Sequence, residues 1–306
     1  IAGGGGTYAG EMEGRKTIMW EKGPNNRLFL RVVTVISVAD SATDIFKAVS
    51  NSNLNPIAES FEIKAIGKDS NSVVIDVTDF FKGDNQPISL SPSTKRRYNL
   101  SSQVGDRSYV SSINSYPINT EVKVVRTFNS TPPAGPQATA PGQPPSVTLP
   151  AAWEAGAVTV EMNNSFILLP KVPMAKRLYD PRVGYFADDY QVFDDQQQKA
   201  EEQIFAVRWR LEPKVEDIEK WKRGELVEPK KPIVYYIDPA TPQKWRKYLI
   251  QGINDWQVAF ERAGFKNAIM GKEWNTTDST MNLEDARFSV VRYLPSDIPN
   301  AYGPNV

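Results

Sequence analysis

The clearest pattern of apolar and polar positions lies in residues 231–294, where it predicts a strand, a long helix and a second strand. Residues 233–237 form a short, unbroken apolar run rich in β-branched and aromatic side chains. Pro232 precedes the run and Asp238-Pro239 follows it, which is typical of a buried strand with defined ends. Residues 287–294 predict the second strand, so a right-handed crossover is the expected connection.

The segment between these runs predicts an amphipathic helix with recognisable ends. Thr241 is the expected N-cap, Pro242 the expected first helical residue and Gly264 the expected left-handed residue at the C-terminus. The helix would be roughly 33 Å long at 1.5 Å per residue. Its large apolar side chains recur every three or four residues, and we expect this face to pack on a sheet. They are Trp245, Leu249, Ile253, Trp256 and Phe260.

The first half of the chain is dominated by strand patterns. They occupy residues 17–20, 27–38, 57–66, 72–77, 119–128 and 156–169, and residues 204–211 predict another strand. In residues 119–128 the alternation of Val122 and Val124 with charged neighbours slips at Val125. Residues 44–49 predict one or two helical turns, and Phe80 and Phe81 are expected to dock on the sheet.

These patterns predict an α+β chain with a β-rich first domain. Residues 1–6 form a glycine-rich flexible linker, residues 7–176 the β-rich domain and residues 177–306 an α/β domain. Residues 131–150 are dominated by proline with small and polar residues, so we expect an extended, solvated loop there. A chain of 306 residues is long enough for two cores.

The composition excludes several kinds of chemistry. The chain has no Cys and no His, so it can form no disulfide, no thiolate metal site, no Ser-His-Asp triad and no histidine-ligated zinc site. Lys and Arg number 36, as do Asp and Glu, so binding to nucleic acid is not indicated. No apolar stretch is long enough for a transmembrane segment.

Two charged clusters have a functional and a plain interpretation. Residues 95–97, Lys-Arg-Arg in sequence, are either an anion or nucleic-acid patch or a solvated loop, and the solvated loop is favoured. An acidic cluster further along is either a calcium site or a solvated turn, and the turn is favoured because the spacing lacks a calcium-loop pattern. Its members are Asp188, Asp189, Asp194 and Asp195.

Several segments resemble a group of large exported bacterial zinc-dependent metalloproteases with a metzincin-like fold. The most specific matches lie at the start of their catalytic domain: residues 232–239, Trp245, Arg246, Trp256, Ala259, Phe260, Ala263, Gly264 and Phe265. Residues 177–180, 182–186 and 208–212 resemble the same family's entry segment. Residues 106–109 and 121–124 are similar to the all-β accessory domain that precedes catalysis in that family.

The resemblance implies that the full-length protein is a zinc endopeptidase acting on a protein or peptide substrate. In the family, a helix bearing H-E-x-x-H follows the first strands, and residues 300–306 resemble the approach to it. This chain has no counterpart of the zinc ligands or the glutamate base, so no residue is assigned a catalytic, cofactor-binding or metal-binding role. We therefore expect an inactive N-terminal portion that partners the missing half of its own catalytic domain. The resemblance also implies export to the periplasm or outer-membrane surface, with or without a lipid anchor.

A second hypothesis is that the β-rich half is a non-catalytic surface module that binds protein or glycan. Aromatic residues such as Tyr98, Tyr109 and Tyr116 would then serve as stacking platforms. Aromatic side chains on a β-rich domain are more often core or ordinary surface residues, and the protease hypothesis is favoured.

Overall fold

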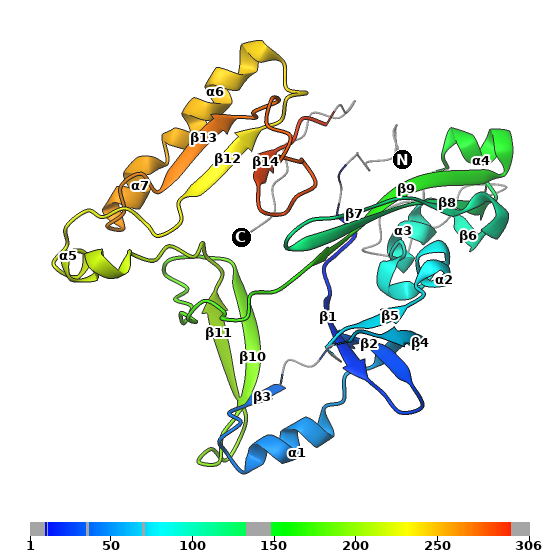
Figure 1. The fold of residues 1–306 in the computed structure, drawn as a ribbon, viewed down its shortest axis with the longest axis horizontal. Helices are drawn as coiled ribbons and strands as arrows, with labels where there is room; N and C mark the ends of the chain where they lie inside the picture. The colour runs from blue at the N-terminus through cyan, green and yellow to red at the C-terminus, as the bar shows by residue number, and fades with distance from the viewer. Residues whose placement is uncertain (1–9, 11, 35–36, 69–70, 133–147, 295–306) are drawn as a thin grey trace.

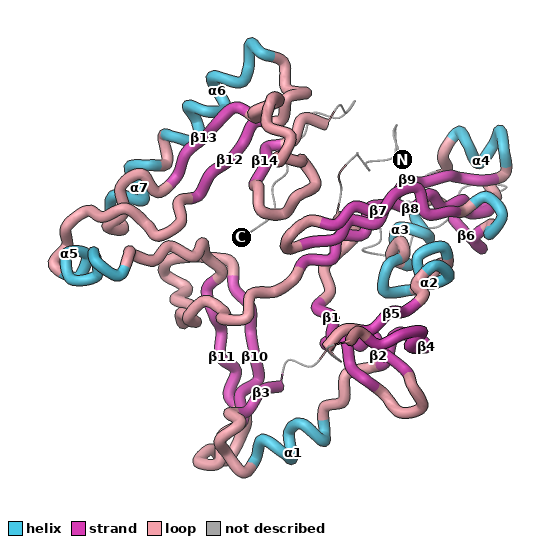
Figure 2. Tube along the Cα trace, viewed as in Figure 1, coloured by secondary structure: helices cyan, strands magenta, loops and turns pink. Residues whose placement is uncertain are grey.

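The computed structural model describes residues 10, 12–34, 37–68, 71–132 and 148–294. It is a mixed α+β structure, rich in strands, with several sheets and a helical segment near its C-terminal end (Figures 1 and 2). The predicted linker 1–6, most of the proline-rich loop and residues 300–306 lie outside the described residues. The predicted α+β class is confirmed at this level.

Two antiparallel sheets make up the first part of the chain. The first has the order β1-β2-β4-β5, and its strands are β1 (Thr17–Lys22), β2 (Arg27–Val33), β4 (Ile57–Ile66) and β5 (Val73–Ile75). The second is built on β8 (Asn119–Ser130), which pairs with β9 (Ala157–Ile167) over eleven consecutive residues. Strands β6 (Leu100–Gln103) and β7 (Tyr109–Ser115) also pair with β8.

Three short helices lie near the two cores along one face of β8. They are α2 (Thr78–Lys82), α3 (Pro92–Arg97) and α4 (Pro150–Ala155). Val122 and Val124 of β8 pack with Phe80 and Phe81 of α2, whereas Phe128 packs in the other cluster with Tyr98. The predicted docking of Phe80 and Phe81 is confirmed, although both lie on a helix.

The slip in the sequence pattern at Val125 does not interrupt β8. The strand pairs with β9 without a shift, whereas its register with β7 shifts between Val110 and Ser112. Arg126 occupies the inward position between Val124 and Phe128. Its guanidinium is fully buried and donates to the backbone oxygens of Ile88 (2.8 Å) and Phe81 (3.1 Å). The sequence pattern looked interrupted because a charged residue stands at a core position.

A thin third sheet combines strands from distant parts of the chain. Strand β10 (Ala187–Phe193) pairs with β11 (Glu201–Ala206) in antiparallel fashion and with β3 (Ser37–Ala39) in parallel fashion. Helix α1 (Ile45–Ser52) lies beside β3, as Figure 1 shows, and confirms the predicted helical turns at 44–49. Strands from both sides of the predicted boundary at 176 therefore share one sheet.

The fourth sheet belongs to a C-terminal unit, residues 211–294. Its parallel order is β13-β12-β14, formed by β12 (Ile233–Ile237), β13 (Ile269–Glu273) and β14 (Ser289–Val291). The strand predicted at 233–237 is confirmed, and the strand predicted at 287–294 is present but only three residues long. β13 was not predicted, because Gly271 and Lys272 interrupt its apolar pattern.

The predicted long helix is present as α6 (Gln243–Asn254) and α7 (Gln257–Arg262), with α5 (Ile218–Lys222) before them. The helix begins one residue later than expected, because Pro242 has extended backbone angles and is itself the N-cap in place of Thr241. Its C-terminus is as predicted, because Gly264 has φ of 92° and the Phe265 N–H donates to the Phe260 oxygen (2.9 Å).

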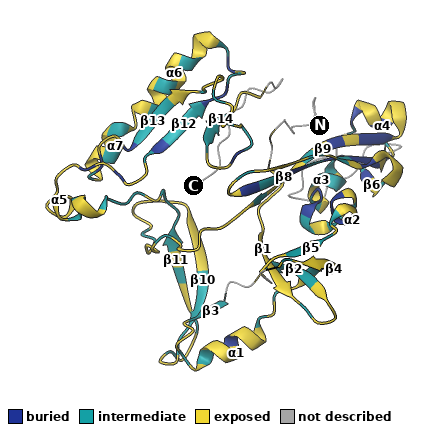
Figure 3. Ribbon diagram, in the orientation of Figure 1, coloured by how far each residue is buried: buried dark blue, intermediate teal, exposed yellow. Residues whose placement is uncertain are grey.

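The predicted sheet-facing side of this helix is only partly correct. Ile253 and Phe260 are half-buried, whereas Trp245, Leu249 and Trp256 are 51%, 38% and 64% exposed, as Figure 3 illustrates for the helix as a whole. The side that meets the sheet is rotated toward Ile250. A Cβ at Gly271 of β13 would lie 3.0 Å from Ile250 Cα, so the helix backbone rests directly on the strand.

Candidate functional site

The two faces of the C-terminal parallel sheet differ in how they are covered. Gly271 faces Ile250 and Ile253 of α6, and alternate residues along a strand point to opposite faces. Val234, Tyr236, Met270 and Val290 therefore lie on the side away from α6, and all four are only half-buried. We call these four residues the open face. The described helices that pack on this sheet, α6 and α7, both do so from the other side.

Aromatic side chains border the open face. The rings of Tyr236, Trp274 and Phe288 meet edge to face, with centroids 5.7–5.8 Å apart. Trp274 directly follows β13 and Phe288 directly precedes β14, so this trio ties both ends of the intervening loop to the central strand. Such contacts stabilise the loop ends, while the rest of the open face keeps an apolar, half-exposed surface.

Asp238 fixes the carboxyl end of the sheet. It follows β12, its side chain is 3% exposed, and its carboxylate accepts from Arg292 Nε (2.8 Å) beyond β14. Burial opposes ionisation, but the N–H groups of Ala240 and Tyr293 together with Arg292 outweigh it, so the pKa of Asp238 lies below its ordinary value. The ion pair therefore connects the residues that follow β14 to the end of β12.

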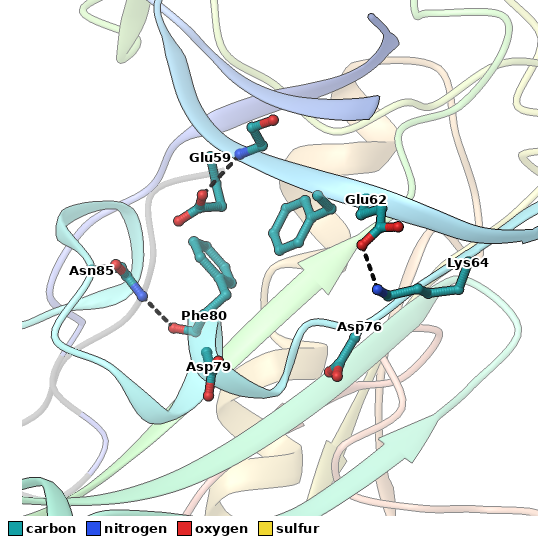
Figure 4. Close-up of a pocket in the computed structure, with 9 residues that line it drawn as sticks. Glu59, Glu62, Lys64, Asp76, Asp79, Phe80 and Asn85 are labelled. Carbon is teal, nitrogen blue, oxygen red and sulfur yellow. Dashed lines mark hydrogen bonds and ion pairs between the residues drawn. The ribbon is translucent and has the colours of Figure 1, made fainter. Parts of the chain in front are cut away.

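A second candidate is a hollow of about 370 Å³ beside β4 (Figure 4). Its floor is the pair of buried rings of Phe61 and Phe80, whose centroids are 5.7 Å apart. Four carboxylates line it, and one is paired, with 2.5 Å between Glu62 and Lys64. The four are Glu59, Glu62, Asp76 and Asp79. None is a buried polar group without a partner, so the hollow has the character of a solvated acidic surface.

Comparison with known proteins identifies the family of most of the chain. Residues 10–214 match the family model described as "Domain of unknown function (DUF5117)", which is more than half of the sequence. The chain belongs to the DUF5117 family. No curated protein and no solved structure matches it.

The DUF5117 match includes one of the two candidate sites and ends before the other. The match runs from before β1 to beyond β11 and includes the acidic hollow. It ends at residue 214, before β12, β13 and β14, so the open face and Asp238 lie in the part that follows. The family match therefore describes the three N-terminal sheets and not the C-terminal one.

The basic triplet of the DUF5117 region has mainly structural contacts. Lys95, in the last turn of α3, pairs with Asp84 (2.5 Å) and lies over the Phe128 ring. Arg97 lies over the Tyr98 ring, and Arg96 is the one exposed residue of the triplet. These contacts favour a structural role for the triplet and do not favour an anion-binding patch.

The acidic cluster of the DUF5117 region is divided between two elements. Asp188 and Asp189 are exposed residues of β10, whereas Asp195 lies in the turn after it. The Asp195 carboxylate accepts the N–H groups of Asp44 and Ile45 at the start of α1, both at 2.9 Å. Among the residues that the structure describes, no three acidic or other metal-binding side chains gather as a metal site.

The proposed stacking platforms of the DUF5117 region are mostly not available at the surface. Tyr98 is completely buried, and Tyr116 is half-buried with its hydroxyl directed at Glu284 (3.2 Å). Tyr109 is exposed. The prediction of exposed aromatics is therefore wrong for Tyr98, because its ring is needed in the core beside Phe128.

No helix in the described ranges is both long and apolar enough to cross a bilayer.

Proposed function

We propose that this chain is the N-terminal portion of a zinc-dependent metallopeptidase that hydrolyses peptide bonds with metal-activated water. The observation that supports the proposal is the C-terminal sheet: three parallel strands with a long helical segment on one side and a half-buried apolar face on the other. Its strand, helix and strand order fits the start of a zincin-like catalytic domain preceded by a β-rich accessory domain.

The open face is the physical reason for expecting a further layer. Parallel sheets are normally covered on both faces, because their strands are apolar on both sides. Val234, Met270 and Val290 present such side chains away from α6. In the proposed enzyme the helix that carries the zinc ligands would cover this face, so this chain would support that helix and orient substrate.

Zinc itself does not fit the residues of this chain. Zinc sites in enzymes use imidazole, thiolate and carboxylate ligands, and this sequence has neither His nor Cys. The described residues also contain no cluster of three carboxylates. The metal and the general base would therefore be held by residues outside this chain, and we assign no step of hydrolysis to residues within it. Export to the periplasm or the outer surface is part of the same proposal.

A metal titration of two proteins tests the proposal. We expect residues 1–306 to bind no stoichiometric zinc and to cleave no peptide. A longer protein, which also contains the residues encoded after Val306, should bind one zinc and cleave a denatured protein substrate, with the activity lost on chelation. Tight zinc binding by residues 1–306, or a longer protein without zinc and peptidase activity, would contradict it.

A further inference from the structure

Asn119 makes a two-point contact between the DUF5117 region and the C-terminal unit. It is the first residue of β8 and is 4% exposed. Its Nδ2 donates to the backbone oxygen of Glu284 (2.8 Å), and its Oδ1 accepts the N–H of Ala286 (3.0 Å). One side chain thus pairs with the backbone of the loop before β14 on both its donor and its acceptor side.

The Glu284 side chain strengthens this contact. Its carboxylate pairs with Lys123 of β8 and accepts from Asn114 Nδ2 (3.0 Å) and from the Tyr116 hydroxyl (3.2 Å). The bond from Lys123 is the main reason that the pKa of Glu284 lies below its ordinary value. We call Asn114, Tyr116, Asn119, Lys123, Glu284 and Ala286 the interdomain clasp.

The clasp is held in place from within the β8 sheet. Asn119 Nδ2 also donates to Glu121 Oε1 (2.6 Å), and Glu121 is 4% exposed. The same carboxylate accepts from Asn163 and Ser165 of β9. Because Glu121 fixes the amide of Asn119, the clasp presents a rigid pattern of hydrogen bonds to the loop.

The clasp lies very close to a strand that needs support. Ala286 is three residues before Ser289, the start of β14, so its position limits that of β14 to within about 10 Å. β14 has three residues and pairs with β12 alone among the described strands. Three residues is the lower end of the usual range of strand lengths, so β14 has few ladder bonds of its own.

We infer that the β7–β8 hairpin is a positioning element that keeps β14 in register with β12. The DUF5117 region would then act as an internal scaffold for the C-terminal unit. This role does not depend on zinc or on peptidase activity, so it goes beyond the function proposed above and can fail independently of it.

Hydrogen exchange of the whole chain tests the inference, with Asn119→Ala and Glu284→Ala as separate variants. The N–H of Ala286 reports the clasp, and the N–H of Asp238 reports β14, because it donates to the Val291 oxygen (3.1 Å). We expect at least tenfold faster exchange at both amides in each variant. Ile233, whose N–H donates to the Ala268 oxygen (2.7 Å) on the β13 side, should be unchanged.

Glu225→Gln is the matched control, because it removes a carboxylate paired with Arg223 (2.8 Å) within the C-terminal unit. This variant should leave all three amides unchanged. Faster exchange at Ala286 without a change at Asp238 would overturn the inference, because the contact would then be passive. If Asn119→Ala unfolds the β8 sheet, hydrogen exchange of the Glu284→Ala variant alone tests the inference, because this variant keeps Asn119 and Glu121.

Discussion

Arg126 shows how one charged residue can occupy a core position. Its carbonyl partners are Phe81 of α2 and Ile88 between α2 and α3, and Nε has no partner among the residues that the structure describes. Burial lowers the pKa of Arg126, because the charged form is poorly solvated there. The two hydrogen bonds join residues 81–88 to β8, at the strand position between Val124 of one core and Phe128 of the other.

Replacing Arg126 by Met tests this role. We expect Arg126→Met to lower the free energy of unfolding by about 2 kcal/mol, because two buried carbonyls lose their donors. Arg107→Met is the control: this residue is exposed, and its distance to Asp106 is 4.0 Å, so the change should stay within about 0.5 kcal/mol. Urea denaturation followed by circular dichroism measures the free energy of unfolding of both variants. A value for Arg126→Met equal to that of the wild type would show that the two hydrogen bonds do not contribute to stability.

Asp238 gives a prediction for pH. Its pKa is lower in the folded than in the unfolded chain, so its ion pair contributes stability above the unfolded value of about 3.9 and loses it as the pH falls through the folded value. Asp238→Asn should therefore be less stable than the wild type at pH 7 and nearly equal to it in strong acid. Urea unfolding between pH 3 and pH 7 measures the difference, and a pH-independent gap would contradict the assignment.

The helical segment α6–α7 shows what periodicity can and cannot predict for an element. The C-terminus at Gly264 was predictable, because glycine followed by a large apolar residue is a local signal. The buried face was not, because the polar residues Asn254 and Gln257 meet the sheet by accepting N–H groups of Gly271 and Ala268. A pattern that counts only apolar side chains therefore assigns the stripe of Trp245, Leu249 and Trp256 to the sheet.

Two glycines of this segment should respond to alanine in opposite ways. Gly264→Ala should destabilise the protein by about 1–2 kcal/mol, because φ is 92° and the new Cβ would lie 2.8 Å from Trp221 Nε1. Gly252→Ala should stabilise it by up to about 1 kcal/mol, because the residue is inside α6 with open space around it. Thermal unfolding compares the midpoints of the two variants. Equal shifts of the midpoint would contradict the role of Gly264 as the left-handed C-terminal residue of the helix.

Long-range connections determine the molecule as a whole, and the sequence did not predict them. β3 pairs with β10, about 150 residues away along the chain, and Asn119 meets Glu284 at a similar distance along it. Local patterns predicted most strands but carry no information about such partners. Which face of the C-terminal sheet stays half-exposed also depends on the elements that pack on it, and a local pattern does not show those.

Asp195 offers a test of one such connection. Asp195→Ala should free the first N–H groups of α1 and destabilise the β3–β10–β11 sheet locally by about 1 kcal/mol. Proteolytic cleavage within residues 40–55 should become faster, while the unfolding midpoint of the β8 sheet stays constant. Asp188→Ala, an exposed change on β10, is the control and should leave cleavage unchanged. Equal cleavage in both variants would show that the cap is not needed.

The contact at Gly271 sets how closely two layers approach each other. Because the helix backbone touches this strand position, even one added methyl group would push α6 outward or bend β13. A shift of α6 would change the angle at which the helix packs on the C-terminal sheet. A substitution at position 271 would therefore loosen the packing of the C-terminal unit while leaving the Asp238–Arg292 ion pair and the interdomain clasp unchanged.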